Sequence, residues 1–353
     1  MSSHTKGAYA EAGVDIAAGE LAVQLMAEHV VKSYRPEVLG GIGGFAGLFD
    51  AAALARYRHP VLATSTDGVG SKVAIAQALD VHHTIGWDLV GMLVDDLVVC
   101  GAEPLFVTDY IACGRVVPEC IAEIVRGIAA ACSAAGAALL GGETAEHPGL
   151  LAEQHYDVAG ATVGVVEFDK LLGAERVRPG DVVVALASSG LHSNGYSLVR
   201  RVFSAAGWEY GRYVPDFGRT LGEELLTPTK VYALDVLALI DAVEVHAMSH
   251  ITGGGLANNL VRVIPDGVRV EIDRATWELT PVFQTVQELG KLSESDMETT
   301  LNMGVGMVAV LPENAAAAAV AVLTARGVPA WICGRTFENV GESAAVRLVG
   351  QHC

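Results

Sequence analysis

Residues 60–72 read PVLATSTDGVGSK, a segment typical of a strand that runs into a glycine-rich turn. Asp67 follows the apolar, β-branched part of this segment, and the end of a strand is a usual place for a magnesium ligand. Gly68 and Gly70 allow backbone amides to face phosphate oxygens, and Lys72 adds a positive charge. The alternative interpretation is an ordinary Asp-Gly turn with a solvated lysine.

Outward from this segment, predicted strands and helices alternate along the chain. We expect strands over residues 60–66, 105–109, 138–140, 158–166, 182–187, 268–272, 306–311 and 330–333. We expect helices over residues 17–33, 84–100, 119–135, 195–206, 228–241, 255–263, 280–289 and 314–326. This mixed order predicts an α/β or α+β architecture.

A charged stretch with proline and glycine divides the chain. Residues 175–181 read ERVRPGD, which is typical of a linker, and the alternation of strands and helices restarts after it. We therefore place a domain boundary near residue 172, which gives an N-terminal domain over 1–172 and a C-terminal α/β domain over 173–353.

Two further glycine-rich segments lie in the first half. Residues 40–47 read GGIGGFAG, and the bare backbone around Gly43 and Gly44 can approach a polyphosphate closely. This segment lacks the Gly-Lys-Ser/Thr ending of a P-loop, so a flexible linker is the alternative. Residues 141–146 read GGETAE after a short predicted strand, and Glu143 is a candidate second carboxylate for a metal.

The apolar stretch 85–98 is interrupted only by three carboxylates, Asp88, Asp95 and Asp96. At about 100° per residue, these side chains fall within about one stripe of a helix. Unpaired carboxylates on a buried helix are costly, so we expect a cation such as Mg²⁺ to neutralise them. The alternative is that they lie on a solvated face or bond to backbone groups.

Two segments of the second half place hydroxyl and amide groups at a predicted helix start. Residues 188–195 read SSGLHSNG and residues 250–255 read HITGGG, and both are candidate anion sites. His192 and His250 are candidates for proton transfer because imidazole titrates near neutral pH, whereas the common role of a lone histidine is structural. Candidate substrate-binding residues in these segments are Ser193, Asn194, Thr252, Gly253 and Gly254.

Composition excludes several classes of protein. The chain has 353 residues, 51% of them hydrophobic and 18% charged, which excludes a disordered protein. Lys and Arg number 23 against 41 Asp and Glu, a net charge of −18 that disfavours nucleic-acid binding. Six cysteines without C-x-x-C spacing, no apolar signal segment and no membrane-length apolar run predict reduced thiols in a soluble, cytoplasmic protein.

Together the motifs form an ordered pattern that runs nearly from end to end. They are YAEAGVD at 9–15, GGIGGF at 40–45, TDGVGSK at 66–72, DL at 88–89, DLVV at 96–99, GAEPLF at 101–106, GGETAEHPG at 141–149, DVAG at 157–160, HSNGYSLV at 192–199, HITGGG at 250–255 and NMGVGM at 302–307. In this order and spacing, the chain resembles the phosphoribosylformylglycinamidine cyclo-ligases.

The resemblance implies a two-domain α/β fold in which the N-terminal sheets of two copies pair into a barrel, so the expected partner is a second copy of the chain. It implies ATP-dependent ring closure of formylglycinamidine ribonucleotide to aminoimidazole ribonucleotide in purine biosynthesis, with release of ADP and phosphate. ATP and Mg²⁺ are the implied cofactors, and K⁺ is a further candidate. The N-terminal domain then binds ATP and metal and forms the dimer.

The resemblance also assigns roles to individual residues. It implies catalytic roles for His250, His192 and Asp67; ATP or phosphate contacts from Gly43, Gly44, Gly68, Gly70, Lys72 and Asp96; substrate contacts from Ser193, Asn194, Thr252, Gly253 and Gly254; and metal ligation by Asp67, Asp96 and Glu143. Three positions depart from the family pattern. Ser71 replaces a common threonine, Asn258 replaces a common glutamate, and Thr299 lies where many members carry arginine. Ser71 retains the hydroxyl, and the other two departures concern local contacts with substrate.

Two other kinds of protein are alternatives: another ATP-dependent synthetase or kinase of the same superfamily, or a non-catalytic nucleotide-binding maturation factor. A selenophosphate synthetase usually has a reactive cysteine near its N-terminal glycine loop, whereas the first cysteine here is Cys100. A maturation factor predicts ATP binding without turnover.

Overall fold

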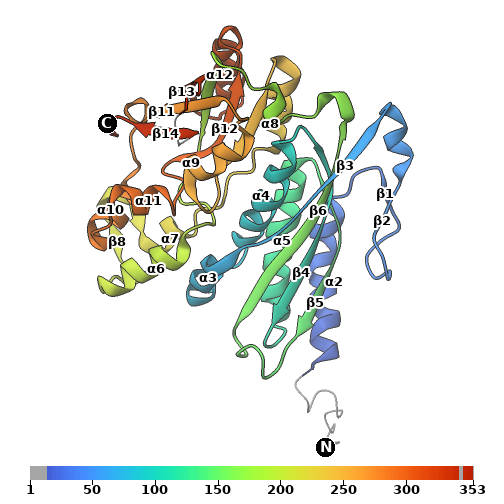
Figure 1. Cartoon of the computed structure of the whole chain (residues 1–353). Coiled ribbons are helices and arrows are strands. Elements are labelled where there is room, and N and C mark those ends of the chain that lie inside the picture. The colour runs from blue at the N-terminus through green and yellow to red at the C-terminus, as the bar shows by residue number, and fades with distance from the viewer. Residues whose placement is uncertain (1–13, 342–344, 353) are drawn as a thin grey trace, which may run out of the picture.

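The computed structural model describes residues 14–341 and 345–352, in which the chain forms two large sheets flanked by helices and two small two-stranded sheets (Figure 1). The elements of the N-terminal half are α2 (Ile16–Lys32), β1 (Val38–Leu39), β2 (Leu48–Phe49), β3 (Pro60–Gly68), α3 (Val73–Leu79), α4 (Ile85–Val98), β4 (Glu103–Cys113), α5 (Pro118–Ala135), β5 (Ala138–Glu146) and β6 (Tyr156–Glu167). Strands β3 to β6 form a four-stranded sheet with the order β3-β6-β4-β5.

Local sequence explains where the helices on this sheet begin and end. The Asp15 side chain caps α2 by accepting a hydrogen bond from the Ala18 amide. Helix α5 starts at Pro118, which needs no amide partner there, and ends at Gly136, which adopts a left-handed φ of 71°. Because β4 and β5 are parallel, the chain must cross over between them, and α5 makes that connection.

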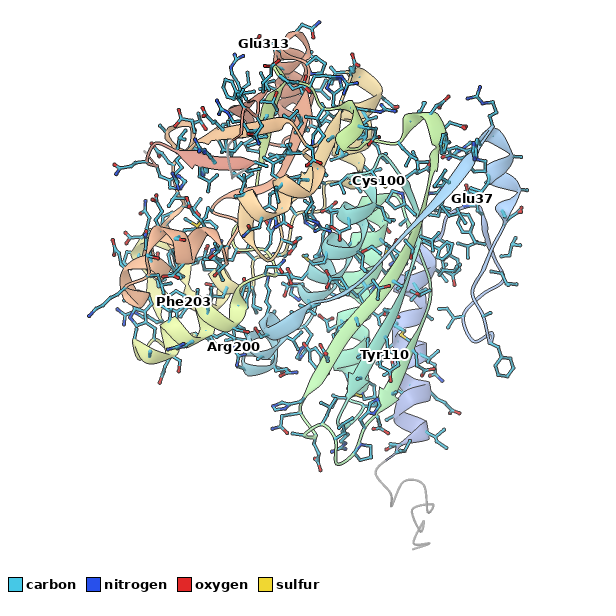
Figure 2. The ribbon with its side chains drawn as sticks, viewed as in Figure 1. Glu37, Cys100, Tyr110, Arg200, Phe203 and Glu313 are labelled. Atoms are coloured by element: carbon cyan, nitrogen blue, oxygen red, sulfur yellow. The ribbon has the colours of Figure 1, made fainter. Side chains whose placement is uncertain are left out.

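Among the residues that the structure describes, helices cover one face of the four-stranded sheet and leave the other face open. Helix α4 packs on β3, β6 and β4, while α5 packs on β4 and β5. Leu62 and Tyr110 project from the opposite face, where they are 61% and 41% exposed, and Figure 2 labels Tyr110 on this sheet. On β6, Leu62 lies opposite Val165 and Tyr110 lies opposite Ala159. An even number of residues separates these two positions of β6, so Leu62 and Tyr110 project from the same face of the sheet.

The C-terminal half holds a six-stranded sheet with the order β10-β12-β7-β13-β11-β14. Its elements are β7 (Val182–Ala187), α6 (Tyr196–Ala205), β8 (Tyr213–Val214), β9 (Arg219–Thr220), α7 (Leu221–Leu225), α8 (Ala233–Ala242), β10 (Ala247–His250), α9 (Gly255–Leu260), β11 (Val268–Asp273), α10 (Pro281–Gly290), α11 (Glu294–Glu298), β12 (Val305–Leu311), α12 (Ala316–Ala325), β13 (Ala330–Glu338) and β14 (Val346–Val349). Strands β7 and β12 are buried almost throughout, so this sheet forms the second core.

The predicted mixed α/β architecture is confirmed, with differences in several elements. The strand predicted over 138–140 continues to Glu146, so the segment GGETAE lies inside β5 instead of in a loop. Helices α3, α7 and α11 and strand β14 were not predicted, because they are short and carry little periodic signal. The helix predicted over 255–263 ends at Leu260 and continues as one 3₁₀ turn.

Two predictions from composition can be compared with the described part of the chain. All cysteines there are free thiols, namely Cys100, Cys113, Cys120, Cys132 and Cys333. Among residues 14–341 and 345–352, none of the helices has both the length and the apolar character needed to cross a membrane.

Candidate functional site

Three predicted site residues from distant parts of the sequence meet where the two halves of the chain touch. Asp67 lies near the end of β3, Asp96 lies on α4, and His250 ends β10. The Nδ1 atom of His250 lies 2.9 Å from Asp96 Oδ1, and the Gly68 amide donates to Asp67 Oδ1 at 2.7 Å. We call Asp67, Asp96, His250 and the neighbouring Asp95 the junction cluster.

Burial and mutual repulsion shift the pKa values of the junction cluster. Burial raises the pKa of Asp95 to about 7. Burial also raises the pKa of Asp67, and the negative charge of Asp96 adds to this increase. For His250, burial lowers the pKa, but the hydrogen bond that its ring donates to Asp96 and the charges of the surrounding carboxylates outweigh the effect of burial, so the pKa lies above its ordinary value. A cation would relieve the repulsion between these carboxylates.

The loop over residues 188–195 packs directly on the turn that follows Asp67. The Ser193 hydroxyl donates to the Val69 carbonyl at 2.8 Å. The Asn194 side chain reaches Met92 Sδ, and its Oδ1 would lie 3.3 Å from a Cβ on Gly253. The predicted substrate-binding segments at 188–195 and 250–255 therefore lie next to each other and beside the junction cluster.

A buried asparagine holds the second of these loops in shape. The Asn259 side-chain amide donates to the carbonyls of Thr252, Gly253 and Gly255, and its Oδ1 accepts from the Thr252 hydroxyl. Gly254 adopts a φ of 98° within this loop, a conformation that disfavours any side chain. Asn259 was not predicted as a site residue. The feature of the sequence that could have indicated it is its position one helical turn after three consecutive glycines.

His192, for which a role in proton transfer was predicted, is buried in the core and does not belong to the junction cluster. It is 2% exposed, and its Nε2 accepts a hydrogen bond from the Ser189 amide at 3.1 Å. Burial holds its pKa well below the ordinary value, so the ring is neutral. A side chain on Gly306 would collide with this ring and with Tyr232, so the histidine fills space in the packed interior.

Lys72, for which a contact with a phosphate was predicted, is also buried, and its ammonium group binds other residues of the chain. It is 0% exposed, and its Nζ donates to Asp88 Oδ1 at 2.7 Å, to the His192 carbonyl at 2.9 Å and to the Thr227 carbonyl at 2.7 Å. An ammonium group has three donors, and these contacts use all of them. Lys72 is thus the cation that neutralises Asp88.

The two buried carboxylates of α4 accept hydrogen bonds from the second half of the chain. Asp88 Oδ1 accepts from the amide and the hydroxyl of Thr229, at 2.9 and 2.7 Å. Asp95 Oδ1 accepts from the Tyr232 amide at 2.9 Å. Of the three aspartates predicted to share one stripe, only Asp96 has a side chain open to solvent, at 44%.

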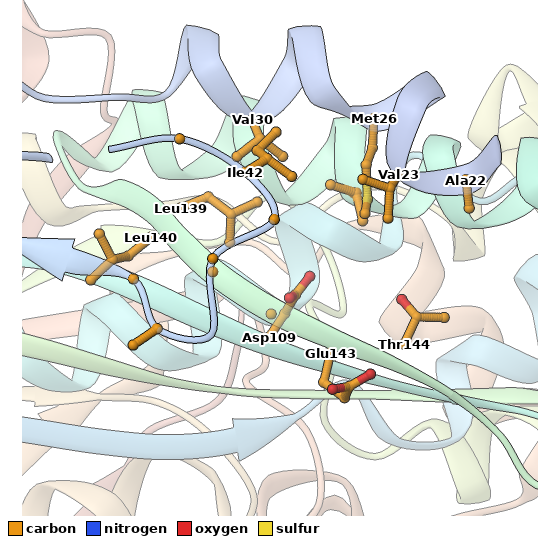
Figure 3. Close-up of a pocket in the computed structure, with 18 of the residues that line it drawn as sticks. Ala22, Val23, Met26, Val30, Ile42, Asp109, Leu139, Leu140, Glu143 and Thr144 are labelled. Carbon is orange, nitrogen blue, oxygen red and sulfur yellow. The ribbon is translucent and has the colours of Figure 1, made fainter. Parts of the chain in front are cut away.

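A cavity of about 390 Å³ lies at the far edge of the N-terminal sheet, and we call it the glycine cavity (Figure 3). Its apolar wall is formed by α2 and strand β5, and the loop over residues 41–47 covers it. Gly43 and Gly44, two of the predicted phosphate-binding residues, line it together with Glu143. The polar side chains labelled in Figure 3 are Asp109, Glu143 and Thr144.

Asp109 is a carboxylate in this cavity that was not predicted. Burial raises its pKa to about 7. A Cβ on Gly142 would lie 1.5 Å from Asp109 Oδ1, so this strand position admits only glycine while the carboxylate keeps its place. The signal for Asp109 was its position at the end of the strand predicted over 105–109.

The junction cluster and the glycine cavity are separate within one chain, so Glu143 does not lie beside Asp67 and Asp96, the residues with which it was predicted to share a metal. In the sheet, Asp67 lies opposite Gly160, Gly160 opposite Asp109, and Asp109 opposite Gly142. Strands β3 and β5 are thus three spacings apart, or about 14 Å. Glu143 follows Gly142 and projects from the opposite face to Asp67. Gly43 and Gly44 line the glycine cavity, whereas Gly68 and Gly70 lie at and just after the end of β3.

A group of possible metal ligands outside the predicted site consists of Glu294, Glu298 and His352. Their ligand atoms lie within 4.8 Å of one another, the only such group among the residues that the structure describes. The Arg274 guanidinium, however, bonds both oxygens of Glu298, at 2.5 and 2.9 Å. We interpret the group as an ion-pair network that already has its cation.

Comparisons with known proteins place the chain in a family. Residues 49–166 match the N-terminal domain of AIR synthase related proteins, and residues 178–347 match the C-terminal domain. The chain is 51% identical over 339 residues to the phosphoribosylformylglycinamidine cyclo-ligase of Geobacillus kaustophilus (strain HTA426), covering 96% of this chain and 98% of that protein. The chain belongs to this cyclo-ligase family. The Bacillus cereus (strain B4264) cyclo-ligase is 49% identical over 335 residues, covering 95% and 96%.

Solved structures with other functions share the fold of this cyclo-ligase family member. Thiamine-monophosphate kinase from Stenotrophomonas maltophilia K279a aligns with a TM-score of 0.69 at 18% identity, covering 94% of this chain and 97% of that one. The hydrogenase maturation protein HypE from E. coli aligns with a TM-score of 0.65 at 21% identity, covering 94% and 93%. At these identities, the likeness establishes the fold alone.

Proposed function

We propose that the chain catalyses ATP-dependent ring closure of formylglycinamidine ribonucleotide to aminoimidazole ribonucleotide, releasing ADP and phosphate, as a step of purine biosynthesis. The observation that carries this proposal is 51% identity to a cyclo-ligase along 96% of the chain. The kinase and the maturation protein are only 18% and 21% identical, so the same fold does not favour their activities here.

The reaction needs a phosphoryl acceptor, a nucleophile and a base. The formyl amide oxygen attacks the γ-phosphorus of ATP, and the bond from that phosphorus to ADP breaks. The amidine nitrogen then attacks the activated carbon, a C–N bond forms, and phosphate leaves with the electron pair of the broken C–O bond. The attacking nitrogen finally loses a proton, which a base must accept.

His250 fits the role of that base. Asp96 is a carboxylate and only accepts hydrogen bonds, so the proton of the neutral imidazole lies on Nδ1 and the lone pair on Nε2. Within the described chain, Nε2 has no hydrogen-bond partner. The Asp96 contact orients the ring, and the neighbouring Asn194 and Thr252 are proposed to bind the ribonucleotide.

Asp67 and Asp96 fit a magnesium ion, because their oxygens are hard ligands and their repulsion favours a cation. When bound there, Mg²⁺ supplies positive charge that stabilises the transferring phosphoryl group. The glycines Gly68 and Gly70 are proposed to turn backbone amides toward the phosphates. Glu143 can join these ligands only from a second copy of the chain.

The glycine cavity is proposed to hold the adenosine part of ATP. Its volume of about 390 Å³ and apolar lining are typical of small-molecule sites. Helices α4 and α5 cover the sheet face between the cavity and the junction cluster, so one ATP cannot reach both within a chain. We therefore propose a homodimer in which the cavity of one chain serves the junction of the other.

A coupled assay for ADP release tests the proposed function. With formylglycinamidine ribonucleotide, Mg²⁺ and ATP, we expect one ADP per ring closed, and little ADP release when the ribonucleotide is omitted. Replacing Na⁺ by K⁺ in the same assay tests the candidate monovalent cation. ATP binding without ribonucleotide-dependent turnover would contradict the proposal and favour a maturation factor.

A further inference from the structure

We propose that Lys72 is a positioning residue that fixes the substrate loop over residues 188–195 onto the turn over residues 67–70. This inference rests on the proposed function for the meaning of the substrate loop. It differs from the phosphate contact that the sequence predicted for the same lysine.

The contacts of the Lys72 ammonium group join three segments. Its Nζ binds Asp88 on α4 and the carbonyls of His192 and Thr227 in the second half of the chain. It also lies 5.3 Å from the ring centroid of Tyr196, the first residue of α6. Only the charged form has three donors, so the charge and the three contacts depend on one another.

Asp88, the ion-pair partner of Lys72, also binds the second half of the chain. Its Oδ1 accepts from Lys72 and also from the amide and hydroxyl of Thr229. Both members of the ion pair are 0% exposed. Removing one member would leave the other as a buried, unpaired charge, whereas removing both charges would not.

The segments that Lys72 connects carry the two parts of the proposed reaction centre, namely the substrate loop and the metal ligand Asp67. The His192 carbonyl directly precedes Ser193, whose hydroxyl donates to Val69, and Asn194 follows. On the other side, Asp67 lies in the same turn as Val69. A second hydrogen bond joins the same two parts of the chain, because the hydroxyl oxygens of Ser71 and Ser197 lie 3.0 Å apart. Lys72 therefore sets the distance between the proposed metal ligands and the substrate loop.

The experiment compares Lys72→Met with the double variant Lys72→Met/Asp88→Asn. The single variant should unfold at a lower temperature, because Asp88 loses its cation. Its kcat/KM for the ribonucleotide should fall by about 10- to 100-fold, the usual effect of a misplaced substrate. Its KM for ATP should change by less than about twofold, since a positioning residue makes no contact with ATP.

The double variant separates positioning from mere stability. It should recover most of the thermal stability, because no buried charge remains unpaired. Its kcat/KM for the ribonucleotide should stay low, because the His192 and Thr227 carbonyls still lack their donor. Lys170→Met, at an exposed lysine, is the matched control and should change neither quantity.

Three outcomes would overturn the proposal. A tenfold or larger rise in the KM for ATP, with the ribonucleotide KM unchanged, would establish a phosphate contact. Recovery of both stability and kinetics in the double variant would establish a purely structural pair. Unchanged amide hydrogen exchange over residues 188–195 in the double variant would exclude loop positioning, and this readout holds even if the proposed cyclo-ligase activity is not found.

Discussion

At the residue scale, the carboxylate of Asp67 combines burial with a charged neighbour. Its pKa is raised by burial and by Asp96, which is typical of a group that awaits a cation. We predict that Asp67→Asn abolishes ATP turnover, with a loss of about 10²-fold or more in kcat. The fold should persist, because Asn keeps an oxygen that can accept from the Gly68 amide.

The measurement is kcat at saturating Mg²⁺, together with thermal unfolding to verify the fold. Asp216→Asn, at an exposed aspartate of the C-terminal half, is the control and should behave as the wild type. A kcat near the wild-type value in Asp67→Asn would remove this residue from the metal site.

His250 is the second residue with a decisive test. We predict that His250→Ala lowers kcat by about 10²-fold or more, the usual contribution of a positioned base. The KM for ATP should change little. His250→Gln keeps a donor and an acceptor, so it distinguishes a brace from a base. If Gln restores most of the activity, His250 only braces the loop; loss in both variants supports proton transfer.

The pH dependence of kcat follows from the same imidazole. Its folded pKa lies above the ordinary 6.5, because Asp96 and the nearby carboxylates favour the protonated ring more than burial opposes it. A base must be neutral, so wild-type kcat should fall as pH falls through that raised pKa. The stability of the fold depends on pH in the opposite direction. The protonated ring stabilises the folded chain at a pH below 6.5, and this stabilisation is lost as the pH rises through the raised pKa of the folded state. An activity profile that stays flat between pH 6 and 8 would argue against His250 as the base.

At the element scale, strand β5 and strand β4 meet so closely at the glycine cavity that one position has no room for a side chain. We predict that Gly142→Ala destabilises the chain by about 1–3 kcal/mol, because its Cβ would collide with the Asp109 carboxylate. Gly141→Ala is the control, since a Cβ there has no atom within 4 Å. Chemical denaturation measures both. Equal stability of the two variants would contradict the close contact between β4 and β5.

At the scale of the whole molecule, the N-terminal sheet has one face that no described helix covers and two edge strands that pair with no other described strand. Leu62 and Tyr110 are exposed on that face, and exposed apolar side chains beside free edges favour association. We predict a homodimer, measured as twice the chain mass by light scattering. Mixing Asp67→Asn with Glu143→Gln should restore activity if the two sites come from different chains. A stable, active monomer at micromolar concentration would refute the dimer.

The sequence alone predicted most of the elements and the groups that carry the chemistry. The alternation of strands with helices predicted a mixed α/β fold, because periodicity and turn residues act locally. The strand before Asp67 and the helix that carries Asp96 could be predicted for the same reason. Family motifs identified the reaction, since their order and spacing are specific.

Only the tertiary structure decided which of these groups meet. The strand order β3-β6-β4-β5 puts Asp67 and Glu143 at opposite edges of a sheet, although both follow similar glycine-rich patterns. Burial decided that the donors of Lys72 are spent on Asp88 and two carbonyls, and that His192 fills the core. Strand order and burial depend on packing between residues far apart in the chain, and local sequence carries no record of that packing.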